Sequence, residues 1–105
     1  MRVVIESPYS GDVERNVKYA RRALLHSLQL GETPFASHLL YTQVLDDNIP
    51  EERERGLLCN LVWLKVAEKV VFYTDYGWSE GMEFAFKWSE AELKPFEIRK
   101  IGLNG

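Results

Sequence analysis

The chain opens with Arg2-Val3-Val4-Ile5-Glu6-Ser7, and Pro8-Tyr9-Ser10-Gly11 follow at once. A short run rich in β-branched residues that ends in turn formers is typical of a buried parallel strand leading into a tight loop. Asp12 can then cap a helix, because apolar residues recur at steps of three or four from Val13 to Leu28 and Gly31 ends the pattern. This order of strand, loop and amphipathic helix predicts an α/β fold.

The rest of the chain repeats this alternation of strands and helices. We expect strands at 33–37, 69–74 and 95–103, a helix from Pro50 to about Ala67, and a helix at 80–93 capped by Ser79. Strands that alternate with helices imply right-handed crossovers and a mostly parallel sheet. The sequence therefore predicts a three-layer, doubly wound sandwich of the Rossmann or flavodoxin-like kind, with a small, mostly parallel sheet of four strands.

Length and composition indicate one globular domain, residues 1–105, with 46% apolar and 28% charged residues. The net charge of -3 argues against a nucleic-acid polymer as partner. The basic cluster Lys18, Arg21 and Arg22 has two interpretations, a solvated helix face or a phosphate contact. No apolar run is long enough to span a membrane, and the N-terminus runs directly into a strand, so we expect a soluble, cytoplasmic protein. Because so short a chain buries a modest core, we also expect a homo-oligomer, a dimer or higher.

The sequence lacks the common signatures of metal and cofactor sites. No glycine-rich phosphate loop follows the first strand, and His26 and His38 have no suitably spaced metal-ligating partners. We therefore expect no metal and no organic cofactor. The one cysteine, Cys59, has apolar neighbours on both sides, which favours core packing over a reactive thiol.

Segment 38–48 has no steady period, and a loop of that length in a small domain usually has a function or contacts another subunit. In doubly wound sheets, ligands bind beyond the carboxyl ends of the strands, here the loops 7–12, 37–47 and 75–79. These loops carry the candidate substrate-binding residues Ser7, Tyr9, Asp12, His38 and Ser79. Structural roles are the alternative, as a packed aromatic ring for Tyr9, a structural hydrogen bond for His38 and a helix cap for Ser79.

Two carboxylates are the candidate catalytic groups. Asp75 at a strand end and Glu83 in the first turn of the next helix could face one cleft, an arrangement that suits glycosidic chemistry. The helix N-terminus favours Glu83 as an anion, hence as a nucleophile. The alternative is that Glu83 forms an ordinary surface pair with Lys87, worth about 0.2–0.5 kcal/mol, and that Asp75 caps a loop.

The segment Gly81-Met82-Glu83-Phe84-Ala85-Phe86 resembles the signature of nucleoside 2-deoxyribosyltransferases, in which the glutamate is the nucleophile. Ser7-Pro8-Tyr9 is similar to a loop that begins many of their relatives. The layout also resembles small phage and prophage proteins of this superfamily at 37–40, at 45–47 and at 50–56.

This resemblance covers most of the chain and implies one nucleoside 2-deoxyribosyltransferase-like domain at 1–105. It implies Glu83 as the nucleophile, with Asp75 near the base or the sugar. Ser7 and Tyr9 would line the sugar pocket, Ser79 would lie near the sugar or a 5′-phosphate, and a neighbouring subunit would complete the site.

The sequence also departs from these enzymes. The chain is shorter, Tyr76-Gly77-Trp78 stands where the enzymes often have an acid-rich stretch, and residues that read a base cannot be matched. We expect a transferase or hydrolase that acts on the N-glycosidic bond of a deoxynucleoside or deoxynucleoside monophosphate, in the host cytoplasm if a phage encodes it. The alternatives are a non-catalytic phage protein of the counter-defence type that binds a nucleotide or nucleotide signal, and an assembly protein whose 38–48 loop only makes oligomer contacts.

Overall fold

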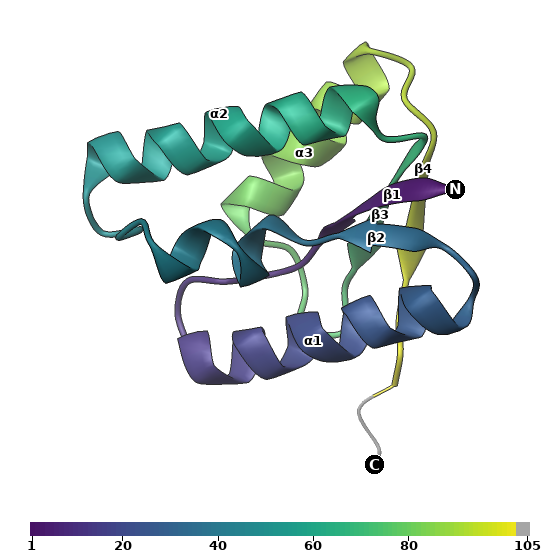
Figure 1. Ribbon diagram of the computed structural model, residues 1–105, viewed down its shortest axis with the longest axis horizontal. Helices are drawn as coiled ribbons and strands as arrows, with labels where there is room; N and C mark the ends of the chain where they lie inside the picture. The colour runs from purple at the N-terminus through teal and green to yellow at the C-terminus, as the bar shows by residue number, and fades with distance from the viewer. Residues whose placement is uncertain (103–105) are drawn as a thin grey trace.

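The computed structural model describes residues 1–102, and in them strands and helices alternate as the sequence predicts (Figure 1). The elements are β1 (Arg2–Glu6), α1 (Val13–Gln29), β2 (Thr33–Phe35), α2 (Pro50–Val66), β3 (Lys69–Tyr73), α3 (Glu80–Ala91) and β4 (Phe96–Arg99). Two short 3₁₀ turns, η1 (Ser37–Leu39) and η2 (Tyr41–Gln43), lie in the long segment before α2. The predicted end of the last strand, Leu103, lies outside the described residues.

The strands form one parallel sheet in the order β2-β1-β3-β4. Val4 of the central strand β1 pairs with Phe35 of β2 and with Val70 of β3. β2 lies at an edge of the sheet. Pro34 lacks a backbone N–H, and an edge strand tolerates this because its solvent side has no neighbouring strand to bond with. The predicted doubly wound, parallel four-stranded sheet is confirmed.

Helices cover both faces of this sheet, with α1 on one side and α2 and α3 on the other (Figure 1). Side chains that alternate along β1 therefore enter different cores. Val3 and Ile5 pack with Tyr19 of α1, while Val4 packs with Leu64 of α2 and Met82 of α3. A strand buried on both faces has to be apolar throughout, which explains the continuous apolar run of β1.

Two side-chain caps fix the helix starts near the carboxyl edge of the sheet. The carboxylate of Asp12 accepts a hydrogen bond of 3.1 Å from the backbone N–H of Arg15 at the start of α1. The hydroxyl of Ser79 accepts one of 3.2 Å from the backbone N–H of Met82 at the start of α3. Each cap satisfies a backbone donor that the first helical turn leaves free.

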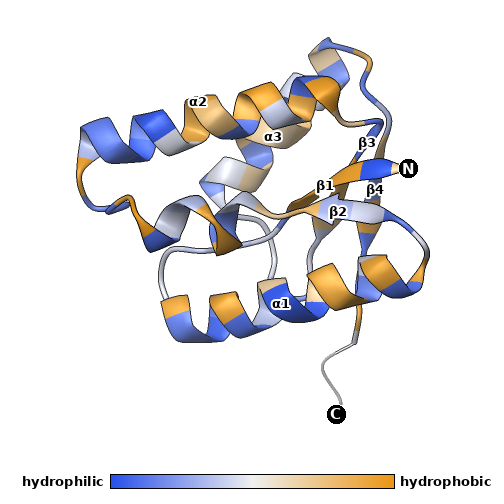
Figure 2. Ribbon diagram, viewed as in Figure 1, coloured by the Kyte–Doolittle hydropathy of each residue, from blue (hydrophilic) through white to orange (hydrophobic). Residues whose placement is uncertain are grey.

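Helix α2 departs from the expectation of a buried helix around Cys59. Leu64 is its one buried residue, Cys59 is half-buried, and Leu58 and Val62 are 50% and 60% exposed. The C-terminal half of α2 is apolar on its exposed side as well (Figure 2). The expectation was wrong because a helix that is apolar all round needs cover on every side, and one small chain covers only one side of it. Within residues 1–102, no helix is long and apolar enough to cross a membrane.

Candidate active site at the carboxyl edge of the sheet

A cleft lies beyond the carboxyl ends of β1, β2 and β3, where the fold predicts a ligand site. Its inner part is narrow, with a volume of about 60 Å³, and its outer part is wide, about 510 Å³. The two parts share the lining residues His38, Asp47, Arg53, Leu57 and Gly81. Because these residues line both parts, the two parts form one cleft.

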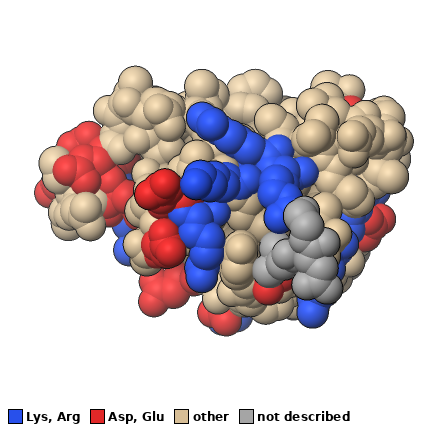
Figure 3. Space-filling view, turned by 90° about the horizontal axis from the view of Figure 1, so that it is seen from below, with Lys and Arg blue, Asp and Glu red and all other residues tan. Residues whose placement is uncertain are grey.

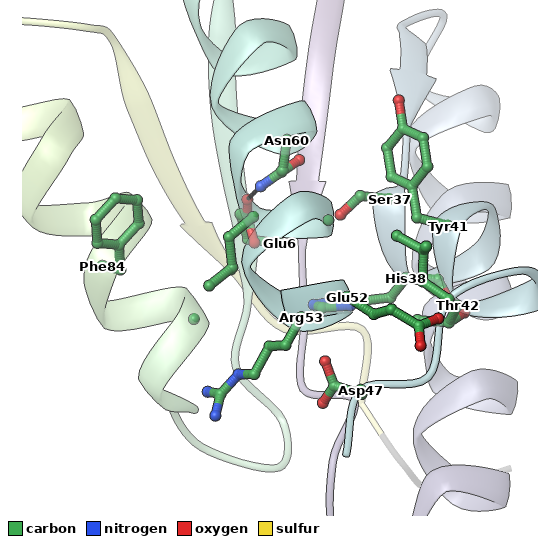
Figure 4. A pocket seen from close by; sticks show the side chains of 14 residues that line it. Glu6, Ser37, His38, Tyr41, Thr42, Asp47, Glu52, Arg53, Asn60 and Phe84 are labelled. Carbon is green, nitrogen blue, oxygen red and sulfur yellow. Dashed lines mark hydrogen bonds between the residues drawn. The ribbon is translucent and has the colours of Figure 1, made fainter. Parts of the chain in front are cut away.

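The inner part of the cleft contains a buried acid that is hydrogen-bonded to a side-chain amide. Glu6, at the end of β1, is 2% exposed, and its carboxylate accepts a hydrogen bond of 2.7 Å from the side-chain amide of Asn60 on α2 (Figure 4). Leu57 and Phe84 contribute apolar surface to the same cavity. A buried acid therefore lies in a pocket that is otherwise largely apolar.

Burial controls the ionisation of Glu6. Desolvation raises the pKa of its carboxyl to about 7, and the hydrogen bond from Asn60 opposes this only in part. At neutral pH the protonated and ionised forms are thus present in comparable amounts. A carboxyl poised in this way can give or take a proton under physiological conditions.

Sequence reasoning missed Glu6, Asn60 and Arg53. The available signal was Glu6 itself, because it directly follows the apolar run from Val3 to Ile5 and lies at the carboxyl end of the strand, where ligands bind in this fold. Alternation along β1 also places it on the same sheet face as Val4, toward α2 and α3. No comparable local signal marks Asn60 on α2.

The outer part of the cleft contains two of the predicted binding residues in contact. The rings of Tyr9 and His38 stack with a centroid distance of 5.5 Å and an interplanar angle of 15°. Burial lowers the pKa of His38 below its usual value, although nearby Asp47 acts in the opposite direction. His38 is therefore neutral at pH 7 and offers a flat aromatic surface together with Tyr9.

A cation and a helix N-terminus lie at the same mouth. Ser79, Glu80 and Gly81 at the start of α3 line the outer part of the cleft, and so does Arg53 of α2. The guanidinium of Arg53 lies 3.4 Å from the carboxylate of Glu80 in a largely exposed ion pair. Helix N-termini and guanidinium groups both favour anions, so this rim can hold a phosphate or a carboxylate group.

Ser7 and Asp12, two more of the predicted binding residues, are absent from the cleft lining. Ser7 is 1% exposed at the end of β1. Asp12 caps α1, as described above. The structure thus brings Tyr9, His38 and Ser79 together in the cleft and places Ser7 and Asp12 outside its surface.

Asp75, a predicted catalytic residue, makes several hydrogen bonds within the protein. Its carboxylate accepts hydrogen bonds from the hydroxyl of Tyr19 and from the backbone N–H groups of Ile101 and Gly102, at 2.5, 2.9 and 2.9 Å. It does not line the cleft. These contacts hold the segment after β4 against α1.

Glu83, the predicted nucleophile, lies on the exposed side of α3. It lines a separate shallow hollow with Trp78, Phe86 and Lys87. Trp78 lines both this hollow and the outer part of the cleft, whereas Glu83 lines only the hollow. The structure therefore does not bring Glu83 and Asp75 together in the cleft.

The basic cluster of α1 lies away from the cleft lining. Lys and Arg side chains gather on the face that α1 covers (Figure 3), where Lys18, Arg21 and Arg22 are exposed. Arg22 donates a hydrogen bond of 3.1 Å to the backbone carbonyl of Gly102. In the described part of the chain, no group of three or more His, Cys, Asp or Glu side chains is arranged to hold a metal ion.

Comparison with known proteins places the chain in a family. A family model described as a domain of unknown function, DUF7768, matches residues 1–99. The chain belongs to this DUF7768 family. No curated protein matches the sequence significantly. A solved structure of a 2-deoxyribosyltransferase from the psychrotolerant bacterium Bacillus psychrosaccharolyticus is similar, with a TM-score of 0.69 and 18% identity over 100% of this chain and 76% of that chain. At this identity the likeness shows the fold.

Proposed function

We propose that this DUF7768 protein binds a nucleoside or nucleoside monophosphate in the cleft and acts at its N-glycosidic bond, by transfer or by hydrolysis. The observation that carries this proposal is a buried acid, Glu6, in an apolar inner pocket, with a cationic side chain, Arg53, at the mouth. One edge of a planar base can enter the narrow inner pocket, while the wider, more polar outer part can take the rest of the nucleoside with its phosphate.

The fold supports the same reaction class. The similar solved structure is a 2-deoxyribosyltransferase, described as a biocatalyst for the synthesis of nucleosides. Because one fold hosts many reactions, the groups in the cleft decide which reaction is possible. Cleavage of a glycosidic bond requires stabilisation of an oxocarbenium-like sugar and a proton for the leaving base, both of which carboxyl groups can provide.

The role of Glu83 as the nucleophile stays a prediction. To act there, its carboxylate would have to reach past Trp78, which lines both the hollow of Glu83 and the outer cleft. The same reaction by direct attack of water needs no carboxylate at this position. An assay of a Glu83 variant distinguishes attack by Glu83 from direct attack by water.

The test is incubation of the protein with a panel of deoxynucleosides and deoxynucleoside monophosphates, with and without a second free base. Base release or exchange is followed by chromatography. Wild-type turnover supports the proposal, and its loss in Glu83→Gln but not in the matched surface variant Glu90→Gln supports Glu83 as the nucleophile. Intact substrates combined with no ligand-dependent change in melting temperature would reject the proposal.

A non-catalytic nucleotide-binding protein is the second candidate function. The exposed position of Glu83 outside the cleft favours it, because the cleft can then hold a nucleotide without a carboxylate nucleophile beside it. In a phage, such a protein would sequester a nucleotide-derived signal used in host defence. Intact substrates with clear ligand-dependent stabilisation would support this second function.

We also propose that the protein is a homo-oligomer. The exposed side of α2 carries Leu58, Val62 and Val66, which follow one another at steps of four residues and so share one face. A second copy of α2 would cover this face in a self-complementary, two-fold contact. Leu57 is exposed as well, but it lies on the opposite side of the helix and lines the cleft.

A further inference from the structure

The inner part of the cleft contains a buried acid without a charged partner in contact. Among residues 1–102, Asn60 is the hydrogen-bond partner of the Glu6 carboxyl, and no Lys or Arg forms an ion pair with it. Buried acids are usually paired with cations, because an isolated carboxylate in an apolar place is costly. The absence of such a cation favours the neutral, proton-carrying form of Glu6.

The side-chain oxygen of Asn60 is a second polar group whose interactions are incomplete. It is buried and, within the described residues, has no hydrogen-bond partner. A buried polar atom without a partner is uncommon in folded proteins and is itself a reason to look for a functional role. The two side chains therefore form a polar pair in the pocket whose hydrogen bonds are not all made within the protein.

The other charged and titratable groups that face this pocket come from four segments. They are His38 of η1, Tyr41 of η2, Asp47 of the loop before α2, and Glu52 and Arg53 of α2, while α3 contributes Gly81 and Phe84. Burial keeps His38 neutral by lowering its pKa. Glu6 is the deepest acid of this group, at 2% exposure.

We propose that the protonated carboxyl of Glu6 donates a hydrogen bond to a ring nitrogen of a purine base whose edge enters the inner part of the cleft. This inference rests on the proposed function, because it assumes a nucleoside in the cleft. Purines offer free ring nitrogens as acceptors, whereas thymine offers only carbonyl oxygens beside its ring N–H. The protonated carboxyl can also donate to a thymine carbonyl, but the thymine ring N–H can bind the ionised carboxylate as well, so it is binding through a purine ring nitrogen that depends on the protonated form.

The same hydrogen bond supplies the proton that glycosidic cleavage needs. When the bond between C1′ and the base nitrogen breaks, its electron pair moves into the base, and the proton of Glu6 passes to the ring nitrogen. Water then adds to C1′ and gives up a proton to the Glu6 carboxylate. The sum is a nucleoside and water giving a free base and a sugar, with Glu6 restored.

Binding measurements test the hydrogen bond without requiring turnover. Calorimetric titration of wild-type protein with 2′-deoxyadenosine should show affinity that falls about tenfold per pH unit above pH 7, because the ligand selects protonated Glu6. Thymidine binding should show no such dependence. In Glu6→Gln, which keeps the shape and a donor but cannot ionise, the affinity for 2′-deoxyadenosine should be independent of pH.

A second variant tests the pair without changing the acid. Asn60→Leu removes the hydrogen bond that lowers the pKa of Glu6, so the pH at which affinity begins to fall should move upward. Glu54→Gln, an exposed acid on the same helix, is the matched control and should behave as wild type. If Glu6 and Asn60 had only a structural role, Asn60→Leu would not shift the pH at which the affinity for 2′-deoxyadenosine begins to fall.

The outcomes separate the two proposals. Wild-type binding of 2′-deoxyadenosine that is independent of pH would overturn the role of Glu6 while leaving the proposed function in place. Absence of binding by any nucleoside or monophosphate would overturn both. Where base release is observed, Glu6→Gln should slow it about 100-fold or more, and an unchanged rate would contradict the proton transfer.

Discussion

The hydroxyl of Tyr19 donates a hydrogen bond of 2.5 Å to the carboxylate of Asp75, and the backbone N–H of Asp75 donates one of 2.8 Å back to that hydroxyl. Burial alone would raise the pKa of Asp75, but the hydrogen bonds from Tyr19, Ile101 and Gly102 outweigh it and hold the pKa below its usual value. The carboxylate thus connects α1, the end of β3 and the segment after β4.

Replacing Asp75 should therefore reduce stability first. We expect Asp75→Asn to lower the free energy of unfolding by about 1–3 kcal/mol, because the neutral amide accepts fewer and weaker hydrogen bonds. Urea unfolding at pH 7 measures this. Glu14→Gln, which removes an exposed pair with Lys18, is the control and should cost less than about 0.5 kcal/mol. A variant with wild-type stability but no base release would instead favour the catalytic role predicted for Asp75.

Glu32 and Arg99 form a charged contact on the α1 side of the sheet. Two guanidinium nitrogens of Arg99 donate to the two oxygens of Glu32, at 2.8 and 2.6 Å, and Lys69 lies 3.0 Å from the same carboxylate. The hydrogen bonds from Arg99 are the main cause that lowers the pKa of Glu32 to about 2. The bidentate geometry makes this contact strong and specific.

This contact predicts a defined loss of stability in acid. Because the pKa of Glu32 is depressed in the folded state, its contribution is complete above the unfolded value near 4.5 and disappears as the pH falls through that value toward 2. Glu32→Gln should lower stability by about 1–3 kcal/mol at pH 7, and its difference from wild type should shrink below pH 4.5. Urea unfolding at several pH values checks this, and a difference that stays constant down to pH 2.5 would rule the explanation out.

The fold could be predicted because its signals are local. The apolar β-branched run from Val3 to Ile5, the spacing of apolar residues in α1 and the caps Asp12 and Ser79 depend on neighbours in sequence. The exposure of α2 could not be predicted in this way. Its apolar pattern is compatible with burial against the same chain or against another one, and only the packing distinguishes them.

The site was harder to predict because its polar groups obtain their roles from distant partners. Glu6 was part of a strand pattern, and its partner Asn60 is 54 positions away. Asp75 follows a strand, which suggests a ligand contact, yet its partner Tyr19 is 56 positions away on α1. A strand-end acid that binds a ligand and one that binds a remote backbone have the same local sequence.

Arg53 should distinguish phosphorylated from unphosphorylated ligands. Its guanidinium lies at the mouth of the cleft beside the N-terminus of α3, where a 5′-phosphate would lie in the proposed binding mode. We expect Arg53→Ala to weaken the binding of a deoxynucleoside monophosphate about tenfold and to leave the deoxynucleoside nearly unaffected. Calorimetric titration with both ligands measures the ratio.

Arg21→Ala is the matched control for this experiment, because Arg21 belongs to the exposed basic face of α1 away from the cleft lining. It should bind both ligands as wild type does. Equal weakening of the two ligands in Arg53→Ala would show that Arg53 does not contact the phosphate. A selective loss in Arg21→Ala would place the phosphate on α1 instead.

The exposed apolar face of α2 predicts the oligomeric state. Val62 is 60% exposed on this face, so a charge there should separate subunits that pair through α2. We expect wild-type protein to sediment as a dimer or higher oligomer and Val62→Glu to sediment as a monomer at the same concentration. Leu25→Glu is the control, because Leu25 is similarly exposed, at 55%, but lies on α1.

The same variant tests whether the interface and the cleft are coupled. Leu57, which lines the cleft, lies on the side of α2 opposite Val66, so any coupling between a partner on the Val62 face and the ligand site has to pass through the helix. Loss of nucleoside binding together with dissociation in Val62→Glu would indicate that the partner completes the cleft. Unchanged binding by the monomer would place the whole ligand site within one chain, and a wild-type protein that is already monomeric would refute the proposed interface.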